Sequence, residues 1–346
     1  MKNMKFRTLI SIIAGGALVL GMQSCKNGDM DFPDYEGGKN VYFAYQNPVR
    51  TLVMGEDDYD TTLDNQHKCM IKATMGGSYN GANVVINFVV DNTLCNNLYF
   101  DNGDPVLPMP ANYYTLSGNT ISFNGGMSGG VEVQLTDAFF NDPLALSNHY
   151  VIPLVMTGVT GADSILQGRT IIDGEVAQRT NYARWDVAPK DYVLYCVKYI
   201  SKYDANYIRR GVDKITVSGV TTTNVRHAAY LEKNEVKSDI TTLSLNSISY
   251  PVTVNVGGVQ KSCVLNLTFN ANGECTVSSA TAGVTASGSG SYRDKSEAKA
   301  WGNQDRDGLY LDYQITFDNA TVATTDTLVW QSRGVNSEEF SSDYIE

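Results

Sequence analysis

The sequence is poor in the residues from which most enzyme active sites are built. It has only 3 histidines in 346 residues, and these fall in three unrelated segments, at His67, His149 and His227. It has no HExxH metal motif. A glycosidase needs two carboxylates placed across one bond, and no spacing among the 37 acidic residues singles out such a pair. We therefore expect a protein that is not an enzyme and needs no cofactor; an accessory to a glycoside hydrolase is the less favoured alternative.

Positive charge is scarce as well. The chain has 26 Lys and Arg against 37 Asp and Glu, which gives a formal net charge of −11 at pH 7. Proteins that bind nucleic acid carry a basic patch that follows the phosphate backbone, and this sequence has none. Nucleic acid is therefore excluded as an expected partner, and an anionic membrane surface would repel the chain.

The six cysteines form no recognisable pattern. There is no CxxC pair and no Cys/His spacing suited to zinc. Apart from Cys25, the cysteines are widely scattered, and their number is odd; they are Cys69, Cys95, Cys196, Cys263 and Cys275. A disulfide framework is therefore not indicated, although one bridge is left open.

Long hydrophobic runs are absent except near the N-terminus. Lys2, Lys5 and Arg7 precede a mostly apolar run over residues 8–22, which Ser24 and Cys25 follow. This run is shorter than the ~20 residues that span a bilayer, and its flanks are those of a signal peptide. We predict a signal peptide over residues 1–24 and a lipid on Cys25, the first residue of a mature lipoprotein. A secretory signal in which Cys25 has no role is the alternative.

The polar, glycine-rich residues after Cys25 predict a flexible tether over residues 25–39. Removal of residues 1–24 takes away three basic residues and no acidic one. The mature chain then has 23 basic and 37 acidic residues, a net charge of −14. The lipid is the expected membrane anchor.

Helical periodicity is also missing, and the apolar residues after Val41 alternate with period two. Short strands separated by Gly, Asn and Asp turns favour a β-sandwich over residues 40–178. Residues 181–189 look like a seam between domains. Beyond it, at least eight antiparallel segments favour a β-barrel over residues 186–340. The predicted fold class is all-β, a sandwich followed by a barrel.

Several stretches resemble two domain families of gut Bacteroidales surface lipoproteins. The first family, an N-terminal Ig-like domain, resembles residues 40–175 through residues 89–94, 114–116, 121–123 and 150–154. The second, a lipocalin-like domain of unknown function, resembles Tyr199 with residues 207–211, and residues 300–302 with 305–313. The resemblance implies an Ig-like sandwich followed by a lipocalin-like antiparallel barrel.

What the resemblance implies about function is glycan capture. Members of these families belong to polysaccharide-utilisation systems with SusD-like and SusE-like outer-membrane partners, and some carry an endo-β-N-acetylglucosaminidase domain. This chain has no room for that domain and no D-x-x-D-x-D-x-E segment. The expected location is the outer membrane, lipid-anchored and facing the cell exterior.

Sugar binding needs an aromatic face beside amide and carboxylate groups. Trp301 lies next to Asn303, Gln304 and Asp305 in a turn-like run, and this group is the first candidate glycan site. The alternative is that Trp301 plugs one end of the barrel. Tyr203 and Tyr207 flank a polar loop and are a second candidate aromatic platform; packing between the domains is the alternative for them.

Asn303, Asp305 and Asp307, followed by Gly308, resemble the start of a calcium loop. Position twelve of that loop is Gln314 rather than Glu, and strands rather than helices flank it, so an ordinary hairpin turn is the favoured interpretation.

The leading functional hypothesis is a non-catalytic glycan-binding surface lipoprotein. The alternatives are a structural or adhesive lipoprotein that binds proteins, and a lipocalin-like binder of a small apolar ligand.

Overall fold

The computed structural model describes residues 33–346. The predicted signal peptide, the predicted lipid site Cys25 and most of the tether lie outside the described residues. Within them, no helix is long and apolar enough to cross a membrane. The end of the predicted tether already belongs to the first domain. The Tyr35 backbone N–H donates to the Gly77 carbonyl at 2.8 Å, and the Lys39 N–H donates to the Asp163 carboxylate at 2.7 Å.

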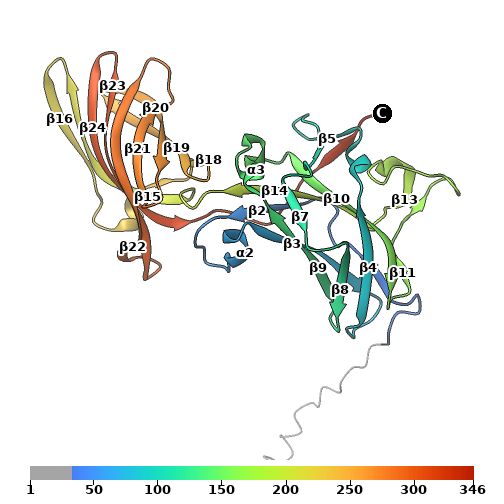
Figure 1. The fold of residues 1–346 in the computed structure, drawn as a ribbon. Helices are drawn as coiled ribbons and strands as arrows, with labels where there is room; N and C mark the ends of the chain where they lie inside the picture. Colours follow the sequence, from blue (N-terminus) through green and yellow to red (C-terminus); the bar gives the residue numbers. More distant parts are fainter. Residues whose placement is uncertain (1–32) are drawn as a thin grey trace, which may run out of the picture.

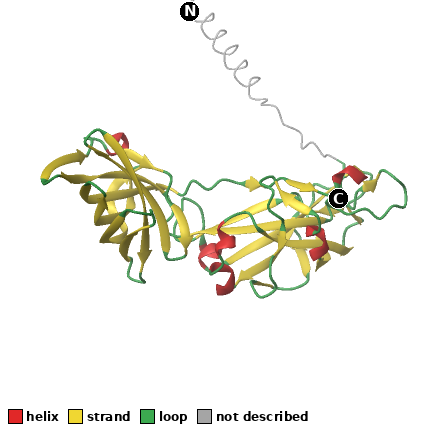
Figure 2. Cartoon of the chain, turned by 90° about the horizontal axis from the view of Figure 1, so that it is seen from above, coloured by secondary structure: helices red, strands yellow, loops and turns green. Residues whose placement is uncertain are grey.

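Strands dominate the described chain, and the helices are single turns (Figure 2). The prediction of an all-β protein is confirmed. The helical turns are α2 (Thr62–Asn65), α3 (Asp137–Phe140), η1 (Asn92–Cys95), η2 (Pro143–Leu146), η3 (Tyr182–Arg184) and η4 (Leu231–Lys233).

The first domain is a sandwich of two sheets. The first sheet contains β1 (Asn40–Tyr42), β3 (Lys68–Gly76), β7 (Tyr114–Leu116), β9 (Ser128–Leu135) and β11 (Ser164–Ile165). The second contains β2 (Pro48–Val53), β4 (Asn83–Val90), β6 (Leu107–Pro108), β8 (Thr120–Asn124), β10 (Tyr150–Thr160), β14 (Tyr192–Ile200) and β25 (Glu338–Glu339). Two small pairs complete it: β5 (Leu98–Phe100) with β26 (Ser342–Tyr344), and β12 (Arg169–Thr170) with β13 (Trp185–Val187).

Period-two alternation builds the sandwich core. Along β3, Cys69 and Ile71 are buried, and the residue between them is more exposed. On β4, in the other sheet, Val84 and Ile86 are likewise buried on either side of a more exposed residue. All four belong to one hydrophobic cluster, as two facing sheets require. The five described cysteines are all buried and unpaired, so no bridge forms among them.

The boundary between the domains differs from the prediction. The sequence placed residues from 186 onward in the barrel, but β14 lies between β10 and β2 in the sandwich. Its apolar run is buried on both faces, which is the pattern of a central strand rather than of an alternating barrel strand. The second domain therefore begins after Ile200.

The second domain is a single curled antiparallel sheet, called the barrel sheet below (Figure 1). Its strands are β15 (Asn206–Val217), β16 (Val220–Arg226), β17 (Glu235–Lys237), β18 (Thr241–Ser244), β19 (Ser247–Val256), β20 (Val259–Phe269), β21 (Glu274–Ser279), β22 (Thr285–Trp301), β23 (Gln304–Phe317) and β24 (Ala320–Ser332). The strands from β18 to β24 follow one another, and β24 returns to pair with β15. Among the described strands, β18 pairs only with β19 and β16 only with β15, so the barrel sheet keeps an open seam.

The interior of the barrel sheet is filled with side chains. Tyr250, Leu265 and Leu267 are fully buried there, and they belong to one large hydrophobic cluster. A lipocalin-like container would need an open apolar interior. The small-ligand alternative is therefore not supported by the structure.

The C-terminal segment returns to the sandwich instead of ending in the barrel. β25 pairs with β2, and β26 pairs with β5. Between them, Phe340 is buried in a cluster with Leu94 and Leu98 of the sandwich. The predicted barrel limit at residue 340 is therefore too late, since the chain leaves the barrel sheet after Ser332.

Arg333 joins the two domains just after β24. Its side chain is 6% exposed. One guanidinium nitrogen, Nη1, donates to the carbonyls of Lys202 (2.7 Å) and Asp204 (2.8 Å), which lie between β14 and β15. Nε donates to the carbonyl of Glu56, in the loop after β2, at 3.1 Å. A single buried cation thus fixes the connection between the sandwich and the barrel sheet.

We predict that Arg333→Met destabilises the protein by about 3 kcal/mol. The change leaves several carbonyls without their donor, and hydrogen bonds to a charged group are the stronger kind. The free energy of unfolding of the chain from residue 26 onward, measured by urea titration, tests this. Arg169→Met is the matched control, because Arg169 pairs with Asp186 on the exposed surface and should cost less than about 1 kcal/mol. Equal values for the two variants would contradict the proposed role of Arg333.

Candidate functional site

A groove of about 810 Å³ crosses five neighbouring strands of the barrel sheet, from β20 to β24. Each strand contributes three consecutive residues, and these are residues 268–270, 274–276, 289–291, 310–312 and 325–327. Because neighbouring strands lie about 4.8 Å apart, five strands span roughly 19 Å. The groove is therefore long enough for several sugar rings in a row.

The strand register explains how the groove forms. The middle residues of the triplets pair across the sheet; they are Phe269, Cys275, Gly290, Leu311 and Asp326. Apart from the glycine, their side chains are buried in the core. Their backbone forms the floor, because side chains alternate between the two faces of a strand. The residues on either side point outward and form two parallel walls. One wall is Thr268, Thr276, Ser289, Asp312 and Thr325, and the other is Glu274, Ser291, Tyr310 and Thr327.

The floor needs glycine at position 290. A Cβ there would lie 2.4 Å from the Tyr310 carbonyl oxygen and 2.5 Å from Leu311 Cδ2, too close for either atom. Gly290 therefore lets β22 lie close to β23 at the centre of the groove.

The walls are polar and rich in hydroxyl groups. Serine and threonine hydroxyls can both donate and accept hydrogen bonds, whereas the carboxylates of Glu274 and Asp312 accept only. Glu274 already accepts a bond from the Asn270 side chain at 2.9 Å. Such a surface can bind a polyhydroxylated ligand through many weak hydrogen bonds.

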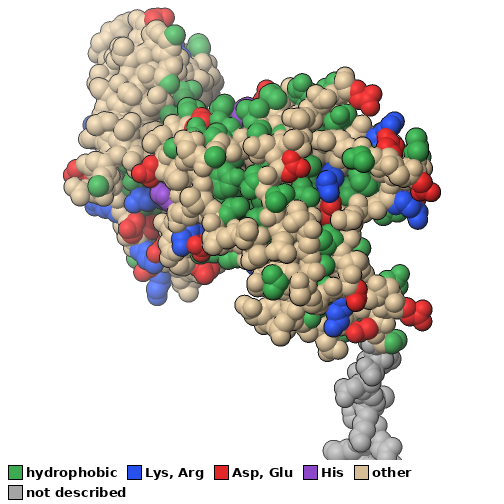
Figure 3. Space-filling model, turned by 45° about the vertical axis from the view of Figure 1, so that its right-hand side comes forward, with side chains coloured by type: hydrophobic (Ala, Val, Ile, Leu, Met, Phe, Trp, Pro, Cys, Tyr) green, Lys and Arg blue, Asp and Glu red, His purple; other side chains and the backbone are tan. Residues whose placement is uncertain are grey.

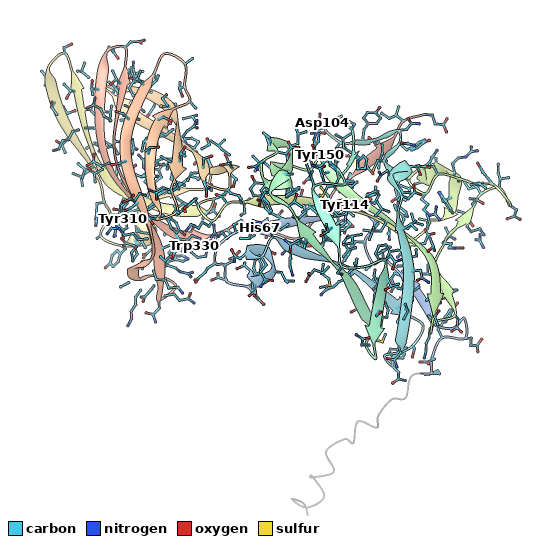
Figure 4. The ribbon with its side chains drawn as sticks, in the orientation of Figure 1. His67, Asp104, Tyr114, Tyr150, Tyr310 and Trp330 are labelled. Atoms are coloured by element: carbon cyan, nitrogen blue, oxygen red, sulfur yellow. The ribbon has the colours of Figure 1, made fainter. Side chains whose placement is uncertain are left out.

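Tyr310 supplies the aromatic group of the groove wall. Its hydroxyl lies 2.8 Å from Glu297 Oε1 and 2.9 Å from Ser296 Oγ, and the Arg293 guanidinium lies 5.1 Å from the ring centre. Burial and the neighbouring Glu297 raise the pKa of Tyr310, so its hydroxyl stays protonated. Figure 4 shows Tyr310 at the end of the barrel sheet that faces the sandwich. These contacts hold the ring in one position.

A buried ion pair lies directly beneath the groove floor. Asp326 of β24 is fully buried, and its carboxylate accepts bonds from Arg209 (3.0 Å), Arg226 (2.6 Å), Tyr250 (2.9 Å) and Tyr313 (2.8 Å). Burial, and after it the charge of Asp326, raise the pKa of Tyr250 well above its usual value, which keeps that hydroxyl a donor. The carboxylate is thus satisfied from four different side chains.

Asp213 of β15 completes the buried cluster. Arg226 Nε donates to it at 2.8 Å and the Thr324 hydroxyl at 2.9 Å. Burial alone would raise the pKa of Asp213, but its hydrogen bond and charge interaction with Arg226 lower the pKa overall. The charges of two arginines and two aspartates on β15, β16 and β24 therefore cancel, and the two tyrosines add β19 and β23 to the cluster.

The structure does not support Tyr203 and Tyr207 as an aromatic platform. Tyr203 is 3% exposed and stacks on Phe269 with ring centres 3.6 Å apart. Tyr207 is fully buried, and its hydroxyl donates to the Tyr203 carbonyl at 2.8 Å. Both rings belong to the core of the barrel sheet, so neither the platform nor the alternative of packing between domains describes them.

The predicted glycan site around Trp301 is the hairpin turn between β22 and β23. Trp301 pairs with Gln304, and the two residues between them, Gly302 and Asn303, both have positive φ, at 61° and 57°. This is the backbone of a tight two-residue hairpin turn. Trp301 is partly exposed at the tip of this hairpin, so it does not plug the barrel.

The carboxylates of the predicted calcium loop are used within the same hairpin. Asp305 accepts a bond from the Lys299 N–H, and Asp307 from the Lys295 N–H, both at 2.8 Å. Lys295 and Lys299 have positive φ (48° and 47°) at two bulges of β22. No group of three or more His, Cys, Asp or Glu among residues 33–346 could hold a metal ion. The geometry of Asn303, Asp305 and Asp307 thus supports the hairpin interpretation.

Gln304 and Asp305 do share a second cavity, of about 160 Å³, between the hairpin and the loop after β2. Lys295 pairs there with Glu56 (3.0 Å) and Arg306 with Asp58 (3.5 Å). The remaining walls are Asp57, Asp307 and Trp330. Arg306 lies 4.7 Å from the Trp330 ring centre, and Trp330 is only 5% exposed, whereas Tyr310 in the groove is partly exposed. This cavity is a contact between domains more than a surface for sugar stacking, and Trp301 does not line it.

The groove itself was missed by sequence reasoning. Its wall residues are separated by up to sixty positions, and only the register of five strands brings them together. A usable signal was nevertheless present: Ser or Thr at alternate positions of β21, β22 and β24 predicts a hydroxyl-rich outer face.

Comparison with known proteins places the chain in a family. A crystal structure of a protein of unknown function from Bacteroides ovatus, solved by structural genomics, is 43% identical, with a TM-score of 0.84. The match covers 90% of this chain and 100% of that one. The chain belongs to the family of this Bacteroides ovatus protein.

Two family models divide the chain much as its strands do. A domain of unknown function, DUF5627, matches residues 202–334, the barrel sheet, and a model described only as an N-terminal domain matches residues 35–163. A second solved structure, of a candidate carbohydrate binding protein from Bacteroides ovatus ATCC 8483, is 13% identical over 69% of this chain and 67% of that one. Its TM-score of 0.24 is too low to support any argument. A search of the curated proteins gives no significant match.

For two tryptophans in the region that the DUF5627 model matches, we predict a large loss of stability at one and a small loss at the other. Trp330 is 5% exposed in the core of the barrel sheet, so Trp330→Ala should lower the free energy of unfolding by about 3–5 kcal/mol. Trp301→Ala, at the hairpin tip, should lower it by less than about 1 kcal/mol. Chemical denaturation followed by circular dichroism measures both. A large loss in Trp301→Ala would restore the interpretation that Trp301 plugs the barrel.

Proposed function

We propose that this chain is a non-catalytic, lipid-anchored surface protein that binds glycans for a polysaccharide-utilisation system. The observation that carries the proposal is the groove over β20–β24, with its hydroxyl walls and Tyr310. Polysaccharides offer many hydroxyls along an extended chain, and a long polar groove with an aromatic wall complements such a ligand. The filled interior of the barrel sheet leaves its outer face as the binding surface.

A lipid anchor would let such a glycan-binding protein concentrate its ligand at the cell surface. A protein held by a lipid at Cys25 on the outer membrane, facing the cell exterior, would keep oligosaccharide at high local concentration. SusD-like and SusE-like proteins are the proposed neighbours that would receive the glycan. Binding rather than cleavage is the proposed task.

The role of the groove in glycan binding can be tested by placing a large side chain in it. Ser289 is exposed at the centre of one wall, between Thr276 and Asp312. Ser289→Trp should weaken glycan binding at least tenfold, because the indole would occupy the space of a sugar ring. Affinity electrophoresis of the chain from residue 26 onward, against host N-glycans, mucin glycans and plant polysaccharides, measures retardation.

Thr285→Trp is the matched control for this test. Thr285 is exposed on the same face of the same strand, four residues or roughly 13 Å from Ser289, and does not line the groove. It should bind glycan as the unchanged chain does. Equal retardation of both variants would place the site elsewhere, and no retardation of the unchanged chain by any glycan would remove the proposal.

The anchor is tested separately. Cys25→Ser should abolish incorporation of an alkyne-tagged fatty acid when the full chain is produced in a bacterium that exports lipoproteins. Cys263→Ala, which changes a buried cysteine of β20, should keep the label. A labelled Cys25→Ser protein would mean that Cys25 is not the lipid site.

One observation favours a second candidate, the structural or adhesive surface protein. β16 pairs with β15 only, and all of its residues except Arg226 are exposed. An open strand edge of this kind can pair with a strand of another protein. Thr223→Pro on β16 would block that pairing and should leave glycan binding unchanged, which separates the two functions.

A further inference from the structure

The walls of the groove carry negative charge and no positive charge. Among the lining residues, Glu274 and Asp312 are exposed carboxylates on the two opposite walls, and none is Lys, Arg or His. A third carboxylate, Asp326, points into the core, where Arg209 and Arg226 neutralise it. A ligand in the groove therefore meets two carboxylates whose charges no partner cancels.

The arginines that border the groove are already engaged. Arg210 pairs with Glu297 at 2.6 Å. Arg293 donates to Ser291 Oγ at 3.2 Å and lies over the Tyr310 ring, so it adds one positive charge at the border against the two carboxylates of the walls. On the face seen in Figure 3, the upper part of the barrel sheet, at upper left, is mostly neither charged nor hydrophobic, and charged side chains gather below it.

Carboxylates and hydroxyls recognise different groups on a glycan. A carboxylate accepts a short, strong hydrogen bond from a sugar hydroxyl, whereas it repels a uronate or a sulfate. The net charge of the chain, −11, adds to that repulsion at longer range.

From this arrangement, and resting on the proposed glycan-binding function, we infer that the groove takes neutral polysaccharides and rejects those that carry uronate or sulfate groups. Glu274 and Asp312 are the residues that set this specificity. Their carboxylates accept hydrogen bonds from the hydroxyls of a neutral polysaccharide and repel the negative charges of an acidic one.

The test compares one glycan in two charge states. The probe is a neutral polysaccharide that retards the unchanged protein, and the same polysaccharide after oxidation of its primary hydroxyls to carboxylates. At low salt, oxidation should weaken binding at least tenfold. At high salt, the difference should shrink, because salt screens repulsion between charges but does not replace a lost hydroxyl.

The double variant Glu274→Gln, Asp312→Asn identifies the cause. It keeps the shape of both side chains and removes their charge, so the difference between the two polysaccharides should fall to threefold or less. Asp318→Asn with Asp343→Asn, which removes two carboxylates that do not line the groove, should keep the tenfold difference.

Each outcome has one meaning. If the oxidised polysaccharide binds as tightly as the neutral one, or more tightly, the specificity is wrong while the glycan-binding function stands. If the double variant keeps the full difference, Glu274 and Asp312 do not set it. If neither form binds the unchanged protein, the proposed function fails, and this inference fails with it.

Discussion

The ion pair between Arg209 and Asp326 is the interaction on which the barrel sheet depends. Burying an unpaired charge is so costly that removing one partner of such a pair typically costs 3–5 kcal/mol. Here the cost of burial is offset because Asp326 also accepts bonds from Arg226, Tyr250 and Tyr313. These partners come from four different strands, β15, β16, β19 and β23. The cluster therefore specifies which strands lie around Asp326, and Asp326 belongs to the row whose backbone forms the groove floor.

Strand alternation connects this core to the surface. The residues that point inward at the floor are core side chains such as Phe269 and Leu311, and each has outward neighbours that form the groove walls. A polar, hydroxyl-rich face is the natural outer surface of a sheet whose inner face is fully packed. Position 290 shows how closely the two faces are linked, because a Cβ there would strike the Tyr310 carbonyl. The packing of the inward side chains thus determines where the outward side chains of the binding surface lie.

Much of the fold could be predicted from the sequence, and little of the candidate site. Alternation with period two correctly predicted strands throughout and an all-β fold. The second domain, for which a β-barrel was predicted, is a curled antiparallel sheet with an open seam. β14 was assigned to the wrong domain, because its unbroken apolar run is compatible with any buried strand and only pairing with β10 and β2 decides the matter.

Tyr203 and Tyr207 were misjudged for a related reason: an aromatic beside a polar loop looks exposed in sequence, while both are buried. The turn at Trp301 was recognised, since Gly302 and Asn303 carry a local signal. For the groove, the only local signal is the alternating Ser and Thr of β21, β22 and β24, which predicts a hydroxyl-rich face. The two walls themselves exist only in the register of five strands.

The central claim is that glycan binds across β20–β24 on the outer face of the barrel sheet. Hydrogen–deuterium exchange of the chain from residue 26 onward, with and without a neutral polysaccharide that it binds, tests this most directly. We predict slower exchange on binding in the five wall segments, residues 268–270, 274–276, 289–291, 310–312 and 325–327, and no change along β16 or in the sandwich. Slower exchange confined to the hairpin tip at residues 301–305 and the loop at residues 56–58 would contradict the account and assign binding to the cavity between the domains.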